Sequence, residues 1–240
     1  MNMQILIAAG AAALLAGIVR GFAGFGAAMI LTPVLSALYG PTTGVPLCLL
    51  LEFCIALPLL RSAATLVDFR RIGMLLVSAS LAVPLGIAVL LALDPEPLRW
   101  TISGIVLAAV LLLATGWRFR GKPTPPATLA AGAASGFLNG LCGMAGPPVV
   151  FYYLAGSEGA AIVRASLIVY FAAVDLVALA GLGLRGLITC DILVLGIMLV
   201  VPYIAGGLVG DRVFPLASEA FFRRLAFIIL TTVALMAPLL

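Results

Sequence analysis

Four polar side chains lie inside apolar segments, where a plain membrane helix carries none. Arg20 and Asn139 each lie within a glycine-rich apolar region, and Glu52 and Asp175 lie midway along two other apolar runs. A charge at membrane depth costs at least ~2.5–3.5 kcal/mol, so it faces the protein interior and has either a partner or a task. Two uses stay open. In the first, Arg20 forms a structural ion pair with Glu52 or Asp175. In the second, Arg20 contributes to binding an anion, and Glu52 or Asp175 takes up a proton.

The glycines around Arg20 recur around Asn139. Glycines lie at positions 17, 21, 24 and 26 in the first region and at 136, 140, 143 and 146 in the second, and an offset of 119 places Arg20 on Asn139. Small residues at this spacing let helix backbones approach closely, and this packing use suits Gly17 and Gly136. The later glycines fit it less well, because Gly146 precedes Pro147 and Pro148, which cannot continue a regular helix.

We therefore expect each glycine cluster to break a helix at membrane depth. Backbone freed there is tolerated only where protein or a water-filled cavity receives it, and a helix that starts after the break points its N–H groups and positive dipole end at that cavity. Such a site suits an anion. The predicted substrate-binding residues are Arg20, Gly21, Gly24, Gly26, Asn139, Gly140, Gly143, Gly146 and Pro147. Glu52 and Asp175 are the candidates for proton coupling or ion pairing, and Tyr170 is a weaker candidate because it shares a segment with Asp175.

The composition is that of an integral membrane protein. Residues of the set AVILMFWYC make up 64% of the chain and charged residues only 9%, against roughly 45–50% and ~25% in soluble domains. Apolar runs recur at the length of membrane helices, and none of the polar stretches is long enough for a soluble domain. Histidine is absent, and the four cysteines show no metal-binding spacing. We expect no metal, no cofactor and no nucleic-acid partner; the net charge of +4 comes from short loops.

The elements that must position these residues form two related halves. The first half, residues 1–117, contains a glycine-broken region followed by apolar runs at 44–60, 72–93 and 98–117. After a polar linker at 118–126, the second half, residues 127–240, repeats the order with runs at 161–184, 192–210 and 225–240. The third segments also share proline followed by glycine, as Pro84 with Gly86 and Pro202 with Gly206.

Loop charge distinguishes two topologies for the glycine-broken regions. If each region crosses the membrane once, the loop Lys and Arg divide seven to five between the two sides; if each turns back as two short arms, they divide ten to two. The positive-inside rule favours the second arrangement. Each half then crosses an odd number of times, which makes the second half an inverted copy of the first. The predicted fold is an all-α membrane protein of two inverted repeats, each a re-entrant hairpin followed by three transmembrane helices, with both termini outside the cytoplasm.

Enzyme classes fit poorly. Ser135 has the setting of an intramembrane serine nucleophile, but without histidine it has no obvious base. No G-x-G-D motif accompanies Asp175, and no H-E-x-x-H is present. We expect no enzyme. A non-transporting assembly subunit is a further alternative, although it would not need two glycine-broken regions in matching places.

The two glycine repeats resemble those of the sulfite exporter TauE/SafE family of bacterial multi-pass permeases. The resemblance rests on glycines 17, 21, 24 and 26 with Thr32-Pro33 in the first half, and on Asn139 to Pro148 in the second. It implies export of sulfite, a sulfonate or a related small sulfur-containing anion across the inner membrane. We expect alternating access coupled to protons or membrane potential, and a possible homodimer in the bilayer; a passive anion channel is the alternative.

Overall fold

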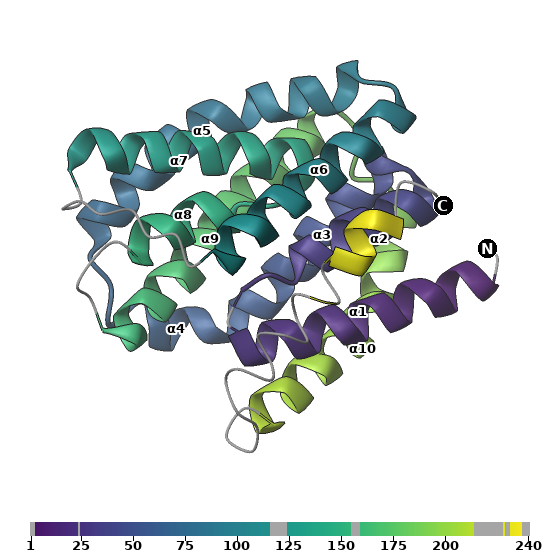
Figure 1. The fold of residues 1–240 in the computed structure, drawn as a ribbon, viewed down its shortest axis with the longest axis horizontal. Helices are drawn as coiled ribbons and strands as arrows, with labels where there is room; N and C mark the ends of the chain where they lie inside the picture. The colour runs from purple at the N-terminus through teal and green to yellow at the C-terminus, as the bar shows by residue number, and fades with distance from the viewer. Residues whose placement is uncertain are drawn as a thin grey trace. The chain divides into compact units, whose positions relative to one another are not determined.

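The computed structural model describes residues 3–23, 25–115, 124–154, 159–213, 228 and 231–236. These residues form helices joined by short turns, and the described part of the chain contains no strand (Figure 1). This confirms the all-α prediction. The helices in chain order are α1 (Met3–Ala23), α2 (Ala28–Tyr39), α3 (Pro41–Ala56), η1 (Leu57–Leu59), α4 (Leu60–Ala63), α5 (Phe69–Ala92), α6 (Pro95–Ala114), α7 (Pro125–Cys142), α8 (Gly146–Leu154), α9 (Ala160–Leu184) and α10 (Cys190–Val213).

Six stretches of the described chain are long and apolar enough to cross a membrane. They are Met3–Gly21, Pro41–Ala63, Phe69–Ala92, Pro95–Leu112, Ala161–Leu184 and Cys190–Gly210. Five of them match predicted runs, and the predicted last run, 225–240, lies largely outside the described residues. The first differs from expectation. α1 alone has span length, so the first glycine-broken region consists of one long helix and the 12-residue α2, not of two short arms.

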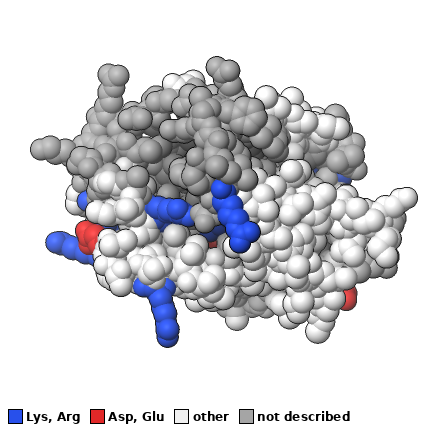
Figure 2. All heavy atoms as spheres, turned by 90° about the horizontal axis from the view of Figure 1, so that it is seen from below, with Lys and Arg blue, Asp and Glu red and all other residues white. Residues whose placement is uncertain are grey.

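The described surface carries broad uncharged areas (Figure 2), as a membrane-embedded protein requires. Figure 2 shows a few Lys, Arg, Asp and Glu side chains on one face, set in broad uncharged areas. Large apolar side chains are exposed along the spans, as with Leu81 at 75% and Ile197 at 69%. Water would not tolerate such contiguous apolar area, whereas lipid tails do. Which side of the membrane each loop faces stays a prediction.

The chain forms two compact units that each draw on both sequence halves. The first unit comprises residues 1–51, 93–116 and 188–240, and the second comprises 52–92 and 117–187. This division differs from the repeat boundaries at 117 and 127, which describe relatedness in sequence rather than compactness. The linker residues 118–123 lie outside the described part of the chain.

In the first unit, α1 packs along α10, and the two helices lie side by side in Figure 1. Glycines allow the approach on both sides of this contact. A Cβ placed on Gly17 would overlap the backbone carbonyl of Tyr203, and one on Gly206 would overlap that of Leu14. The two backbones therefore touch directly, as in membrane helix pairs built on small residues.

The second unit repeats this contact with α5 and α7, which also lie side by side in Figure 1. A Cβ on Gly136 would overlap the Ala79 carbonyl, and one on Gly86 would overlap the Phe137 carbonyl. Thus the glycine-rich helix of each half packs on the proline-containing third helix of the other half. The packing interpretation of Gly17 and Gly136 is confirmed, and the matching pairs agree with two related halves; their inverted relation stays a prediction.

Candidate functional site

The break between α7 and α8 is a tight reversal of the chain. α7 ends because Gly143 adopts a left-handed backbone with φ 66°, and its N–H donates to the Asn139 carbonyl at 2.9 Å. This is the cap that glycine makes most easily. Prolines 147 and 148 then follow within the first turn of α8, where their missing N–H groups cost little.

Two hydrogen bonds show that α8 runs back along α7. The hydroxyls of Thr128 and Tyr152, near the start of α7 and the end of α8, lie 2.7 Å apart. Ser135 Oγ donates to the Ala145 carbonyl at 2.6 Å. A continuous helix would separate the first pair by roughly 36 Å. The sequence expectation that this region turns back is therefore met within the second unit.

A chain of hydroxyls fixes the backbone at this break. Tyr170 OH donates a hydrogen bond to Ser135 Oγ at 2.9 Å, and the Ser135 hydroxyl donates one to the Ala145 carbonyl. Both side chains are fully buried, at 0% exposure. The bonds join α9, α7 and the turn between α7 and α8. The sequence indicates Ser135 only as a candidate nucleophile. Its two hydrogen bonds at the break depend on contacts between helices, which sequence spacing does not reveal.

One turn further along α7, an amide meets a carboxylate. Asn139 Nδ2 donates to Asp175 Oδ1 at 3.0 Å, and the two residues are 0% and 4% exposed. Asn139 Oδ1 is buried and has no hydrogen-bond partner. Buried polar atoms in proteins are almost always paired, so an orphaned acceptor beside a carboxylate marks a place for a donor or a cation.

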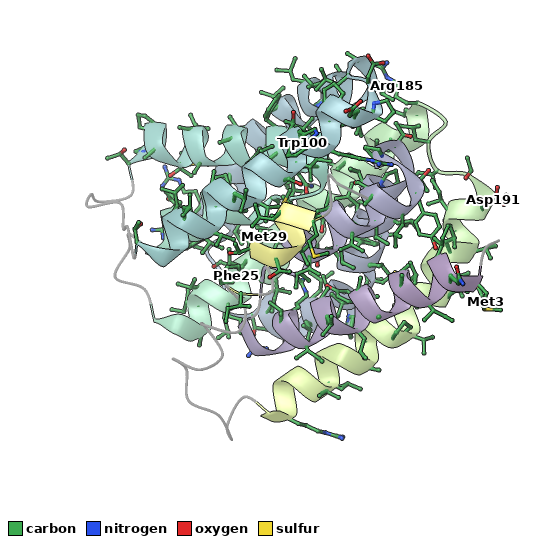
Figure 3. The ribbon with its side chains drawn as sticks, turned by 45° about the vertical axis from the view of Figure 1, so that its right-hand side comes forward. Met3, Phe25, Met29, Trp100, Arg185 and Asp191 are labelled. Atoms are coloured by element: carbon green, nitrogen blue, oxygen red, sulfur yellow. The ribbon has the colours of Figure 1, made fainter. Side chains whose placement is uncertain are left out.

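The break between α1 and α2 has different chemistry. Gly26 adopts φ 96°, and a Cβ built on it would come within 3.9 Å of only Val19, seven residues earlier in α1. The chain therefore turns back here too, and α2 packs against α1. Figure 3 labels Phe25 in the break and Met29 in the first turn of α2. Unlike α8, α2 begins without proline, and the N–H groups of Met29, Ile30 and Leu31 donate to the carbonyls of Gly26 and Ala27.

Arg20 lies in the last turn of α1 and is 7% exposed. A cation at a helix C-terminus compensates the negative end of the helix dipole, which is one reason for its position. Gly21 is half-buried beside it, and Gly24 lies outside the described residues.

The predicted site residues thus divide between the two units. Arg20, Gly21 and Gly26 belong to the first, whereas Asn139, Gly140, Gly143, Gly146, Pro147, Glu52 and Asp175 belong to the second. Glu52 is buried at 6% exposure. An ion pair of Arg20 with Glu52 or Asp175 stays a prediction, because Arg20 belongs to the first unit and both acids belong to the second.

Gly140 and Gly146 differ in what their missing side chains explain. A Cβ on Gly140 would overlap the Val83 carbonyl, so packing against α5 accounts for that glycine. At Gly146 a Cβ would meet only Phe171 Cζ, at 3.9 Å. The space at Gly146 is open to a ligand, and the space at Gly140 is filled.

The site offers nothing for metal chemistry in the part of the chain that is described. Three or more His, Cys, Asp or Glu side chains do not come together anywhere among those residues. The arrangement provides charge, hydroxyl and amide hydrogen bonds, and helix ends, which can bind a small ion.

Comparison with known proteins identifies the family. No curated protein and no solved structure matches the chain significantly. The family model described as "Sulfite exporter TauE/SafE" matches residues 9–237, nearly the whole chain and both glycine repeats. With its six span-length helices and this match, the chain is a multi-pass membrane protein that belongs to the sulfite exporter TauE/SafE family of transporters.

Proposed function

We propose that this protein is an inner-membrane permease that exports a small sulfur-containing oxyanion by alternating access, with uptake of a proton during the cycle. The family supports transport of sulfite or a related sulfur anion. The observation that carries the finer proposal is that each helix break has a buried ionisable residue of a different sign close to it. Arg20 accompanies the first break and Asp175 the second.

The first break is the proposed anion-binding element. Arg20 supplies a full positive charge and guanidinium donors from the last turn of α1, and the N-terminus of α2 supplies the positive end of a dipole. Gly26 leaves room beside this turn, because among the described residues a Cβ there would come within 4 Å only of Val19. An oxyanion matches this combination of positive charge, donors and space.

The second break is the proposed proton-binding element. Asp175 accepts from Asn139 Nδ2, and Asn139 Oδ1 next to it remains an unused acceptor. A proton on Asp175 would give that acceptor a donor, since a protonated carboxyl group donates one hydrogen bond. Proton binding would therefore satisfy a buried polar atom that is otherwise orphaned. The nearby protons of Tyr170 and Ser135 are already used in fixing the turn.

Reconstituted flux tests the proposal. The purified chain alone is placed in liposomes and offered sulfite, thiosulfate, sulfate, sulfoacetate and acetate, with and without a pH gradient. We expect saturable transport of one or more of the sulfur anions, accelerated by the gradient. The variant Asp175→Asn should keep anion exchange at equal pH and lose the response to the gradient.

Two other functions predict different results. A passive anion channel would give flux that does not saturate and never runs against a gradient. An assembly subunit would give no flux when reconstituted alone. A gradient response that persists in Asp175→Asn would contradict the proton-binding role of the second break but not the transport of the anion.

A further inference from the structure

Unpaired polar atoms gather on two packed helices of the first unit. Among the described residues, six buried side-chain nitrogen or oxygen atoms have no hydrogen-bond partner, and five of them lie on α2 and α6. These five are Thr32 Oγ1, Ser36 Oγ, Tyr39 OH, Arg99 Nε and Ser103 Oγ. Thr32, Ser36 and Ser103 are 0%, 1% and 3% exposed, so lipid or bulk water does not reach them.

Other hydroxyls of the chain satisfy themselves on their own helix. Thr101, two residues before Ser103 in α6, donates to the Pro97 carbonyl at 2.8 Å. Ser78 and Thr128 donate to the carbonyls of Met74 and Thr124 in the same way. This local bond is always within reach of a helical serine or threonine. Its absence at Thr32, Ser36 and Ser103 means that their hydroxyls are directed elsewhere.

The unpaired atoms lie on one face of each of two helices that pack together. On α2 they recur at intervals of four and three residues, and on α6 at an interval of four, so each set shares one helix face. α2 packs against α6, and Arg99 Nη2 donates to the Ala37 carbonyl, next to Ser36, at 3.2 Å. At Gly44, α3 comes so close that a Cβ would lie 2.5 Å from the Ser36 backbone nitrogen. We call Ser36, Arg99 and Ser103 the α2–α6 polar seam.

The charge of this seam decides what it can hold. Arg99 is the one charged residue among the five, and the acids of the same helix start, Asp94 and Glu96, are exposed. The free Nε–H can only donate, and serine hydroxyls can donate as well. A cation is disfavoured next to the guanidinium. The occupant must therefore accept several hydrogen bonds and tolerate a positive charge.

We propose that the α2–α6 polar seam is a second binding site for a small oxyanion, which accepts hydrogen bonds from Arg99 Nε and from the hydroxyls of Ser36 and Ser103. Thr32 lies one turn inside α2, close to the first break, and Ser36 lies one turn further toward Arg99. The hydroxyls of α2 thus lead from the proposed anion site at the break to the seam. The identity of the anion rests on the proposed function; the existence of the site rests on the unpaired atoms.

Equilibrium binding of radiolabelled sulfite to the purified protein in nanodiscs tests the inference, with stoichiometry as the readout. We expect two sulfite ions per chain for the natural sequence and one for Arg99→Gln. The double variant Ser36→Ala with Ser103→Ala, which keeps the charge and folds more safely, should weaken the second site at least about 100-fold, as expected for two lost hydrogen bonds to an ion. Thr101→Ala is the matched control on α6, and Arg185→Gln controls for loss of one positive charge; both should bind two.

The outcomes separate the two proposals. One sulfite per chain in the natural protein, unchanged in Arg99→Gln, would overturn the second site and leave the proposed function standing, with water in the seam. Two ions in Arg99→Gln would overturn it as well. No binding by the natural protein would count against both. Loss of one ion in Arg20→Gln and of the other in Arg99→Gln would establish two separate sites.

Discussion

The two helix breaks have the same construction but opposite chemistry. In both, a glycine with positive φ follows the longer helix, and a shorter helix then turns back. The φ angles are 96° at Gly26 and 66° at Gly143. The first break has Arg20 nearby and a proline-free helix start, whereas the second has Asp175, Asn139 and two prolines. The prolines remove N–H groups that an anion would use. The two turns are therefore similar in backbone construction, while the polar residues around them differ in charge.

The way the turns are held also differs. In the second break, a buried hydroxyl chain from Tyr170 through Ser135 ties the turn to α7 and α9. In the first, the turn is made by backbone hydrogen bonds such as Met29 N–H to the Gly26 carbonyl, at 3.1 Å. A break anchored by neighbouring helices resists change more than a locally bonded one. The hydroxyl chain therefore adds side-chain support from α7 and α9 to the second break.

The largest expected effect comes from removing the charge of the first break. Arg20→Gln should reduce sulfite transport by at least about 30-fold, because truncating one member of a buried charged contact costs roughly 2–5 kcal/mol. Flux in liposomes, measured beside the amount of inserted protein, gives the result. Arg185→Gln is the control, since that residue is exposed at the end of α9. Loss of the protein itself, rather than of its transport, would support the structural ion pair instead.

Next in size are the helix contacts that the two halves share. Gly17→Ala and Gly136→Ala both place a methyl group into a backbone carbonyl, so each should destabilise the protein by ~1–3 kcal/mol, as overpacking does. Thermal unfolding in detergent measures the loss. Gly10→Ala and Gly73→Ala, on α1 and α5, are matched controls with no atom within 4 Å of the added methyl. Unequal losses at Gly17 and Gly136 would show that the two contacts are not equivalent.

Sequence reasoning could place the breaks but not their surroundings. Glycine and proline report local backbone geometry, so positions 26, 143 and 147 were accessible from the chain alone. A charged residue inside a long apolar segment is visible in the sequence and costly in a membrane, and this identifies Arg20, Glu52 and Asp175 as candidates. The bond from Ser135 to the Ala145 carbonyl depends on the reversal of α8. The packing of each glycine-rich helix on a helix of the other half joins residues that are more than 50 positions apart in the sequence. Neither leaves a periodic signal. For the same reason the sequence does not reveal that the backbone of α5 packs directly against Gly140.

A smaller effect distinguishes a glycine that is needed for its positive φ, Gly26, from one with an ordinary φ and open space around it, Gly146. Gly26→Ala should destabilise by ~1–2 kcal/mol, because a left-handed backbone costs an L-residue about that much. Gly146→Ala has ordinary φ and a nearest neighbour at 3.9 Å, so its unfolding midpoint should hardly move. The same thermal assay compares them. Equal unfolding midpoints for both variants would mean that the first turn relaxes to another conformation. The two breaks would then differ only in the polar residues near them.

The smallest effect tests whether the second break is held by its hydroxyl chain. Tyr170→Phe removes the donor to Ser135 and leaves the bond from Ser135 to the Ala145 carbonyl in place. The expected loss is ~1 kcal/mol, the net worth of one buried hydrogen bond. Ser135→Ala removes both bonds and should cost more, whereas Thr101→Ala, a self-bonded hydroxyl on exposed α6 surface, should be neutral. An unchanged unfolding midpoint in both Tyr170→Phe and Ser135→Ala would show that the glycine and prolines alone hold the turn, and the second break would then be no more rigid than the first.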